Sequence, residues 1–282
     1  MNRLSSSGVA LSAPLSLLLL LVFLVPLALL FPISLQPFQD GAAGSGLTLG
    51  NYSELVTDSF LRSVVVETLL LGLVVTLVCL VLGYPLAYYI VQATPRMRLA
   101  LTLLVIFPML LNVVVRSFGW IALLANRGLV NNLLRDIGIT DAPIRMLFNH
   151  FSVLVGLVHV FLPFMVLMLI PAIQAIPKDV QNAAYTLAAT RRRVLWSVTL
   201  PMSMPGILSG SILVFVLSIS ALVTPRMLGG GSYKVMATLI YDDFLQTLNW
   251  QAGAAMAFAL TGMTMVLVFL SSKLLNKFGG NE

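Results

Sequence analysis

Six long apolar segments restrict what this chain can fold into. A helix rises about 1.5 Å per residue and the hydrocarbon core of a membrane is about 30 Å thick, so roughly 20 apolar residues can cross it. Only 9% of the 282 residues are charged, against roughly a quarter in soluble domains. We therefore expect an all-α integral membrane protein with six transmembrane helices in one transmembrane domain over residues 1–282. The expected spans are 14–35, 63–91, 99–125, 151–176, 205–228 and 251–274.

The first apolar segment has two interpretations. Arg3 precedes it, and the small residues 42–44 lie further on, as in a cleaved signal. Its apolar stretch is longer than the roughly 7 to 15 residues of a signal core. We therefore expect a retained span.

The basic residues predict the orientation. Positive charges collect on the cytoplasmic side of membrane proteins. If both termini are cytoplasmic, that side holds nine of the 16 Lys and Arg residues, and among acidic residues only Asp179 and Glu282. This topology places residues 177–204 in the cytoplasm and the amphipathic residues 126–150 at the outer interface. The net charge of +6 is then explained by topology, and no nucleic-acid partner is expected.

Enzyme motifs are missing from the sequence. The run GGGSYK at 229–234 has the wrong spacing for a phosphate-binding loop. His150 and His159 have no acidic residue at metal-ligand spacing, so we expect both to be structural. The single cysteine, Cys79, can form no internal disulfide. The sequence therefore predicts no catalytic, metal or cofactor site in this chain.

The cytoplasmic segment combines a small-residue helix with three arginines. Pro177 is suited to the first turn of a helix. We expect Ala183, Ala184, Leu187 and Ala188 to form one narrow helical face that lies in a groove of another protein. We expect the arginines at the C-terminal end of this helix, where its dipole favours cations. The alternative is an ordinary interfacial helix with anchoring arginines.

This segment resembles the EAA loop of bacterial ABC-type importer permeases. That pattern is Glu-Ala-Ala, three residues, Gly, nine residues, Ile, one residue and Leu-Pro. The chain keeps every spacing, with Asn182 in place of Glu and Ala188 in place of Gly. We expect Ala188 to favour helix over turn. The resemblance assigns ATPase coupling to Asn182, Ala183, Ala184, Leu187, Ala188, Leu200 and Pro201.

Further segments, including LGYPLAYYI at 82–90 and VRSFGWIALL at 115–124, are similar to the spermidine/putrescine branch of these permeases, in its first-permease subfamily. The resemblance implies a type I ABC importer permease fold in a bacterial inner membrane. It also implies a second permease, making a heterodimer, a dimer of ATPase subunits that bind ATP and Mg²⁺, and a periplasmic binding protein. The implied cargo is a small amine or polyamine; phosphonate, ferric iron and amino-acid-like amines remain alternatives.

Polar residues in the apolar segments are the candidates for the translocation path, because buried charge usually faces a cavity or a partner. Glu67 either pairs with Arg62 or attracts a cationic amine. Asn112, Arg116 and Trp120 recur every four residues and, with Pro108, are expected to share one helix face. The other candidates are Ser218, Thr224, Tyr241 and Asp242, for which packing or surface solvation is the alternative.

Two other classes of protein compete with an importer permease. An integral membrane enzyme would need an intramembrane nucleophile or metal set, which the sequence does not show. A secondary transporter driven by an ion gradient would have no need of the EAA spacing, and the two halves of the chain do not mirror each other.

Overall fold

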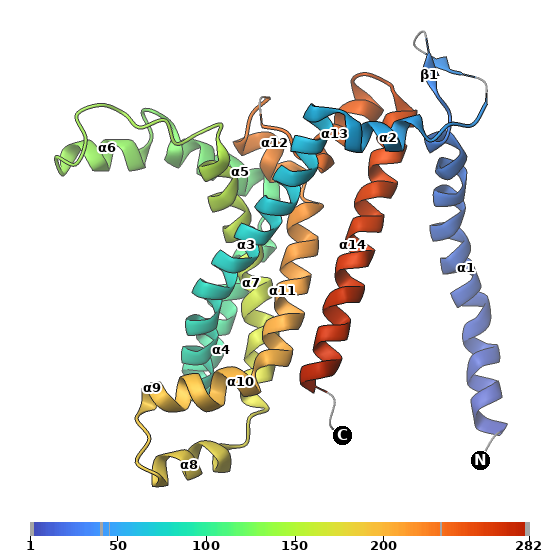
Figure 1. Cartoon of the computed structure of the whole chain (residues 1–282). Coiled ribbons are helices and arrows are strands. Elements are labelled where there is room, and N and C mark those ends of the chain that lie inside the picture. Colours follow the sequence, from blue (N-terminus) through green and yellow to red (C-terminus); the bar gives the residue numbers. More distant parts are fainter. Residues whose placement is uncertain (1–2, 40–41, 45, 232, 280–282) are drawn as a thin grey trace. The chain divides into compact units, whose positions relative to one another are not determined.

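The structure is a computed structural model that describes residues 3–39, 42–44, 46–231 and 233–279. The described chain is almost entirely helical, with one two-stranded ribbon (Figure 1). The elements are α1 Arg3–Ser34, β1 Phe38–Gln39, β2 Ala42–Ala43, α2 Gly50–Thr57, α3 Ser59–Gln92, α4 Pro95–Ile106, the 3₁₀ helix η1 Phe107–Leu110, α5 Val113–Leu124, α6 Leu129–Asp136, α7 His150–Gln174, α8 Lys178–Thr186, α9 Arg191–Val194, the π-helix η2 Leu195–Thr199, α10 Leu200–Met202, α11 Met204–Ile219, α12 Val223–Leu228, α13 Met236–Leu245 and α14 Trp250–Gly279.

The chain divides into two compact units. Unit 1 comprises Met1–Arg62 and Leu239–Thr261, and unit 2 comprises Ser63–Thr238 and Gly262–Glu282.

In unit 1, polar side chains fix the segment that follows α1. The hydroxyls of Ser34 and Tyr52 lie 2.8 Å apart, and Asn51 donates to the carbonyls of Ser34 and Gln36 at 2.9 Å each. The ribbon pairs Phe38 with Ala43 in antiparallel register. Outside this segment, the leucines between positions 15 and 29 of α1 are exposed, as expected of a helix that meets lipid or another chain.

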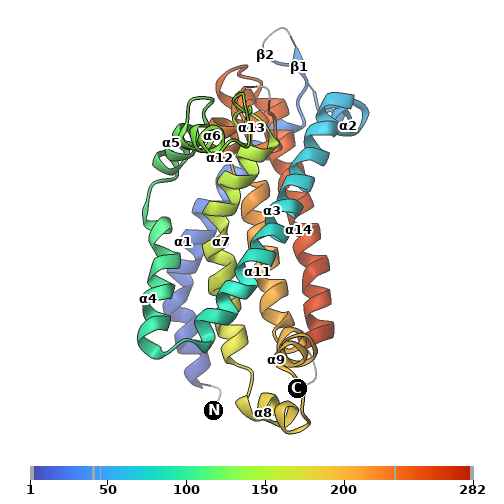
Figure 2. The same cartoon turned by 90° about the vertical axis from the view of Figure 1, so that its left-hand side faces the viewer.

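The core of unit 2 lies where α3, α7 and α11 pack together (Figure 2). Val75, Leu157, Met165 and Val214 are completely buried there. At the crossing of α7 and α11, a Cβ on Gly206 would come within 2.2 Å of the Ala172 Cβ. Small residues of this kind let membrane helices approach closely, so this crossing depends on glycine.

In the described part of the chain, length and composition identify five helical stretches that could cross a membrane, and a sixth if a bent pair counts as one span. The predicted spans 14–35, 63–91, 151–176 and 251–274 are confirmed as α1, α3, α7 and α14. The helical membrane fold is therefore as expected.

The predicted span 99–125 is wrong as a continuous helix. It divides into α4, η1 and α5, because Pro108 has no N–H for the helical ladder and Asn112 starts a new helix. Asn112 has extended backbone (ψ 136°), and its side chain accepts the N–H of Val114. Pro108 and Asn112 therefore do not share a helical face with Arg116.

The predicted span 205–228 is also interrupted. Helix α11 ends at Ile219, and α12 begins only at Val223. The hydroxyl of Ser220 bonds back to the carbonyl of Val216 at 2.8 Å, which competes with continuation of the helix. Ser218 and Thr224 therefore lie on two different helices.

Candidate coupling site and translocation path

The segment from α8 to α10 lies at one end of unit 2, and α6 with α12 lies at the other end (Figures 1 and 2). Helix α8 begins directly after Pro177, as expected, and has Asp179 in its first turn. It ends in a turn in which two of its last carbonyls accept backbone N–H groups. The N–H of Ala188 donates to Tyr185 O at 3.0 Å, and the N–H of Ala189 donates to Ala184 O at 3.1 Å. This pair of bonds is the Schellman motif.

Only two of the four residues that were expected to share one helical face lie within α8. Ala183 and Ala184 lie on α8, but Leu187 caps the helix and Ala188 has φ +58°. The expectation that Ala188 favours helix over turn is wrong, because the Schellman motif needs a left-handed residue at this position. Glycine adopts that conformation without cost, whereas other residues lose roughly 1–2 kcal/mol.

The turn presents an isolated apolar side chain. Leu187 is 84% exposed, and Asn182, Ala183 and Ala188 are exposed around it. A hollow of about 320 Å³ lies beside it between α8 and the following helix, lined by Ala184, Leu187, Ala188, Ala189, Arg193, Val194, Ser197 and Val198. The segment therefore presents the protruding side chain of Leu187 beside a hollow, where the sequence predicted one narrow helical face.

The three arginines are at the opposite helix end from the one expected. Arg191, Arg192 and Arg193 form the first turn of α9, where the hydroxyl of Thr190 accepts the N–H of Arg193. The N-terminus of a helix carries partial positive charge and disfavours cations. All three arginines are exposed, so an external anion can compensate their charge.

Leu200 and Pro201 lie just before a sharp bend. The helical run Arg191–Met202 meets α11 at 65°, and Ser203 lies at the joint. Ser203 is completely buried, and its hydroxyl lies 3.0 Å from that of Tyr84 on α3. The bend that connects the coupling segment to α11 is thus tied to a second transmembrane helix.

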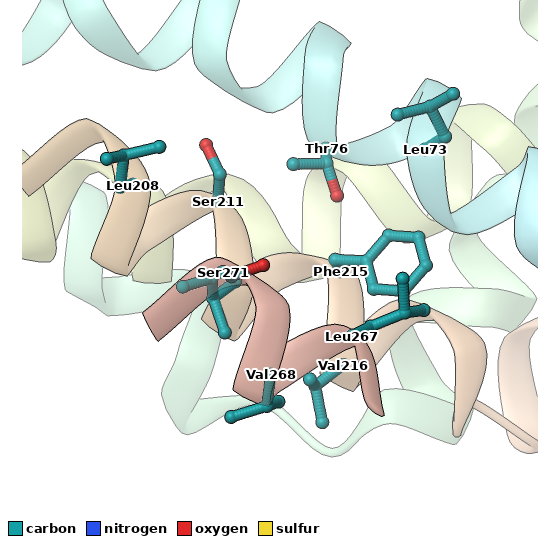
Figure 3. Close-up of a pocket in the computed structure, with 10 residues that line it drawn as sticks. Leu73, Thr76, Leu208, Ser211, Phe215, Val216, Leu267, Val268 and Ser271 are labelled. Carbon is teal, nitrogen blue, oxygen red and sulfur yellow. The ribbon is translucent and has the colours of Figure 1, made fainter. Parts of the chain in front are cut away.

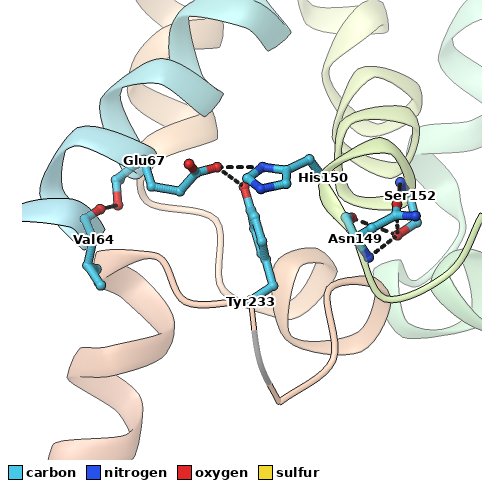
Figure 4. Close-up of polar contacts among 7 residues, drawn as sticks. Val64, Glu67, Asn149, His150, Ser152 and Tyr233 are labelled. Atoms are coloured by element: carbon cyan, nitrogen blue, oxygen red, sulfur yellow. Dashed lines mark hydrogen bonds and ion pairs between the residues drawn. The ribbon is translucent and has the colours of Figure 1, made fainter. Parts of the chain in front are cut away.

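At the other end of unit 2, Glu67 is the centre of a polar cluster (Figure 4). The hydroxyl of Tyr233 donates to Glu67 Oε1 at 2.8 Å, and His150 Nδ1 lies 2.7 Å from the same oxygen. The rings of His150 and Tyr233 meet edge to face at 4.8 Å. Glu67 thus pairs with His150, so the first of its two sequence interpretations, an ion pair with Arg62, is wrong.

Within this cluster, Tyr233 is buried and held in place by the protein, whereas His150 is exposed to solvent. Tyr233 is buried, and its loop is held by the bond from the N–H of Met236 to the hydroxyl of Thr68 at 2.9 Å. Burial, with the bond to Glu67 and the charge of that carboxylate, raises the pKa of Tyr233 far above its ordinary value. The side chain of His150 is 71% exposed, so solvent and solutes can reach this side.

Arg116 and Trp120 lie one turn apart on α5, facing α7. The Trp120 indole N–H donates to His159 Nδ1 at 3.0 Å, and the two rings meet edge to face at 5.7 Å. Trp120 therefore joins two helices. A role in helix packing, which sequence analysis left open, has a direct contact to support it.

The hydroxyl candidates Ser218 and Thr224 are both buried. The Ser218 hydroxyl donates to the carbonyl of Val214 at 2.7 Å and is buried. Thr224 is buried against the position where a Cβ on Gly156 would stand. Nearby, a hollow of about 250 Å³ is lined mainly by apolar side chains of α3, α11 and α14, with Thr76, Ser211 and Ser271 as its hydroxyls (Figure 3). Thr76 donates to its own helix at Gly72 O.

Tyr241 and Asp242 lie on α13, in unit 1. Asp242 is buried, so its expected surface solvation is wrong. Its neighbour Asp243 bonds to the Thr247 hydroxyl at 3.3 Å. Burial, together with the charge of Asp242, raises the pKa of Asp243 despite that bond.

Sequence analysis missed four residues that make the polar contacts in unit 2. Tyr233, His150, His159 and Ser203 each bond to a candidate or to a residue far away in the chain. Tyr233 and Glu67 are 166 positions apart, so no local pattern could have paired them. Among the described residues, no group of His, Cys, Asp and Glu could hold a metal ion.

Residues 80–278 match the family described as "Binding-protein-dependent transport system inner membrane component". The match covers more than half of the chain, and the chain belongs to this family. Its helices and its EAA-like segment are those of an ABC importer permease. It is therefore a multi-pass inner-membrane transport subunit, and ATP hydrolysis belongs to a separate partner.

Curated relatives and solved structures agree with this class. The chain is 34% identical over 233 residues to the spermidine/putrescine transport system permease protein PotB of Escherichia coli (strain K12), covering 82% of this chain and 84% of that protein. It is 34% identical over 234 residues to PotB of Haemophilus influenzae, covering 82% of each. A molybdenum transport system permease protein, ModB of Mycobacterium bovis, is 30% identical over 66% of this chain and 68% of its own length.

The fold is similar to that of a bacterial ABC transporter involved in the import of alginate, with a TM-score of 0.76 and 17% identity over 99% of this chain and 100% of the other. It is also similar to the MetNI methionine ABC transporter, with a TM-score of 0.61 and 16% identity over 80% and 99% of the two chains. These similarities support the permease fold. A further structure of a bacterial alginate ABC transporter is in complex with a periplasmic protein that holds an alginate pentasaccharide.

Proposed function

We propose that this chain forms, with a second and non-identical permease subunit, the path by which a small amine or polyamine crosses the bacterial inner membrane. The observation that carries the proposal is the similarity over most of both lengths to spermidine/putrescine permeases. A periplasmic binding protein would deliver the cargo. Two ATPase subunits would bind ATP and Mg²⁺, and this chain would hold no cofactor.

The coupling segment, which runs from α8 to α10, would contact the ATPase through the side chain of Leu187 and the turn at Ala188. Leu187 stands out from the surface, and Asn182, Ala183, Ala184 and Ala188 surround it with small side chains. The bend after Leu200 and Pro201 is tied to α3 through Ser203 and Tyr84. A movement imposed on α8 would therefore reach both α3 and α11.

The cluster of Glu67, Tyr233 and His150 would meet the cargo first. A carboxylate beside aromatic rings suits a primary ammonium group, through charge and through the ring faces. The imidazole of His150 already lies next to Glu67, where an ammonium group would bind, and its exposure lets an incoming amine replace it. Asn112, Arg116, Trp120, Ser218, Thr224, Tyr241 and Asp242 remain candidates for other parts of the path.

Reconstitution tests the proposal. The chain is copurified with the second permease and the ATPase of the same transporter, and placed in liposomes with the binding protein. Uptake of labelled putrescine and spermidine should need ATP. Uptake without ATP would identify a secondary transporter, and a binding protein that holds phosphonate or ferric iron would refute the amine cargo.

A matched pair of variants tests the outer cluster. Glu67→Gln keeps the shape and an acceptor for Tyr233 but removes the charge, so the KM for putrescine uptake should rise at an unchanged maximal rate. His150→Gln removes the imidazole that an incoming amine has to displace from Glu67, and it should lower the KM. Equal uptake by both variants and the unmodified protein would exclude the cluster from the path.

A further inference from the structure

Two nitrogens of the Arg116 guanidinium are buried without a partner. Nε and Nη1 have no hydrogen-bond acceptor among the described residues. Arg116 lies in the second turn of α5, within a stretch that is apolar enough to cross a membrane. An unpaired buried charge is costly, and intramembrane arginines normally pair with an anion or face water. These nitrogens therefore call for a counter-charge.

The polar neighbours of Arg116 on α5 and α7 already have hydrogen-bond partners. Asn112 accepts the N–H of Val114 at 2.8 Å, and the Ser117 hydroxyl donates to Val113 O at 2.9 Å. His159 accepts the Trp120 N–H through Nδ1, so in its neutral form its other ring nitrogen is a donor. None of these side chains is placed to accept from Arg116.

No acid of the described chain supplies the charge. Within the part of the chain that the structure describes, Arg116 has no carboxylate oxygen within ion-pairing distance. The described residues therefore leave its charge without a partner, and a neighbouring molecule can supply one.

The surface next to Arg116 is open to another molecule. Val115 is 62% exposed and Phe118 is 60% exposed, and a Cβ on Gly119 would meet no atom within 4 Å. At about 100° per residue, Gly119 lies about 60° around the helix from Arg116. A second helix can approach closely at a small residue, so its side chains could reach the guanidinium from there.

We propose that Arg116 pairs with an Asp or Glu carboxylate of the second permease subunit, across an interface formed by the Val115, Phe118 and Gly119 face of α5. The inference rests on the proposed function, which supplies the second permease. A carboxylate can accept two parallel bonds from a guanidinium. A polyamine would be repelled by the bare cation, whereas the neutralised pair leaves the path open to it.

The first test measures assembly of the two permease subunits and does not require transport. The chain is coexpressed with the second permease and the ATPase, and copurification of the second permease is measured. Arg116→Gln should lower its yield about tenfold or more, because breaking a buried pair leaves an unpaired charge. Arg116→Lys should be intermediate, since it keeps the charge without the planar fork. Arg135→Gln, at an exposed arginine of α6, is the matched control and should assemble normally.

Two further experiments separate loss of pairing from misfolding. In Arg116→Glu, selection for restored assembly should return second-permease variants in which one acid is replaced by Lys or Arg. A photocrosslinking residue in place of Phe118 should label the second permease. Labelling of lipid alone, or suppressors that never involve an acid, would overturn the pairing.

The two proposals fail in different ways. If no second permease copurifies with the unmodified chain, the heterodimer fails and the pairing fails with it. If assembly with Arg116→Gln equals that of the unmodified chain, only the pairing is refuted. Normal assembly with loss of uptake would indicate that Arg116 meets the cargo, which would refute the pairing and contradict a cationic cargo.

Discussion

The backbone N–H of Ala189 donates to the carbonyl of Ala184 at 3.1 Å, across a turn in which Ala188 has φ +58°. This bond ends α8 and turns the chain towards the arginines of α9. It also defines what the small residues of the motif do. Ala183 and Ala184 belong to a helix, whereas Ala188 adopts the left-handed conformation, which is unfavourable for a residue that has a Cβ.

Replacing Ala188 by glycine should stabilise this turn by about 1 kcal/mol, because glycine adopts the left-handed conformation freely. A difference of that size slows local opening about fivefold. Hydrogen exchange of the amides in 178–190 would measure it. Ala183→Gly, inside α8, is the matched control and should speed exchange. Faster exchange in Ala188→Gly would contradict the strain assigned to this position.

An arginine at position 184 should prevent ATPase association. Ala184 lines the hollow beside Leu187, and a long cation there fills the hollow next to Arg193. The ATPase retained on the purified permease would report the effect. Gln181→Arg adds the same charge on α8 away from the hollow and should retain the ATPase. Coupled transport at the normal rate by Ala184→Arg would remove the docking role.

Sequence patterns predicted the helices of this fold better than their breaks. Apolar length identified α3, α7 and α14, because each is long enough to span by itself. The break at Asn112 depends on a side chain that caps the next helix by accepting the N–H of Val114, and Ala188 adopts a left-handed conformation that alanine normally avoids. Both features are local choices between two competing backbone states, which the apolar pattern does not distinguish.

The candidate sites could also be predicted only in part, because their partners are distant in the sequence. Glu67 stood out as an acid in an apolar run, but its partners come from the start of α7 and from the loop before α13. The arginines were assigned to the wrong helix end, because the turn at Ala188 starts a new helix. Spacing located the coupling segment, and only the folded backbone shows which helix terminus each charge meets.

The bond between Tyr84 and Ser203 should transmit movement between the coupling segment and α3. Tyr84→Phe leaves Ser203 without this partner and should cost about 1 kcal/mol. We expect more ATP hydrolysed per molecule transported, since the bend is held less firmly. Ser203→Ala completes a double-mutant cycle, in which the pair should show non-additivity. Tyr88→Phe is the control, because Tyr88 lies one turn further along α3 and lines an apolar hollow together with Tyr84 and Leu200. Additive effects would show that the bond transmits nothing.

Asp243 should make the protein less stable as the pH rises. Burial raises its pKa in the folded state, so the folded protein holds this proton more tightly than the unfolded chain. The stability associated with that proton is complete at low pH and is lost as the pH rises through the unfolded and then the folded pKa. Asp243→Asn should therefore raise the melting temperature at pH 7 and have little effect near pH 3. A lower melting temperature at pH 7 would contradict this sign.

The exposed stripe on α6 should lie against lipid. Leu129, Leu133 and Ile137 recur every fourth position and are 59%, 51% and 63% exposed. The opposite side is anchored by Asn131, which bonds to Ala125 O and Ile144 O at 3.0 Å each. A helix with one apolar stripe at the end of a membrane bundle favours the lipid interface.

Spin labels can distinguish lipid from water at this stripe. The single cysteine, Cys79, is buried, so Cys79→Ala gives a background for one label at a time. A label on Leu133→Cys should be relaxed more by oxygen, which concentrates in lipid, than by a water-soluble nickel complex. A label on Arg135→Cys, on the polar side of the same helix, should show the reverse. Equal access to the nickel complex at both sites would place the stripe in water, where a binding protein could cover it.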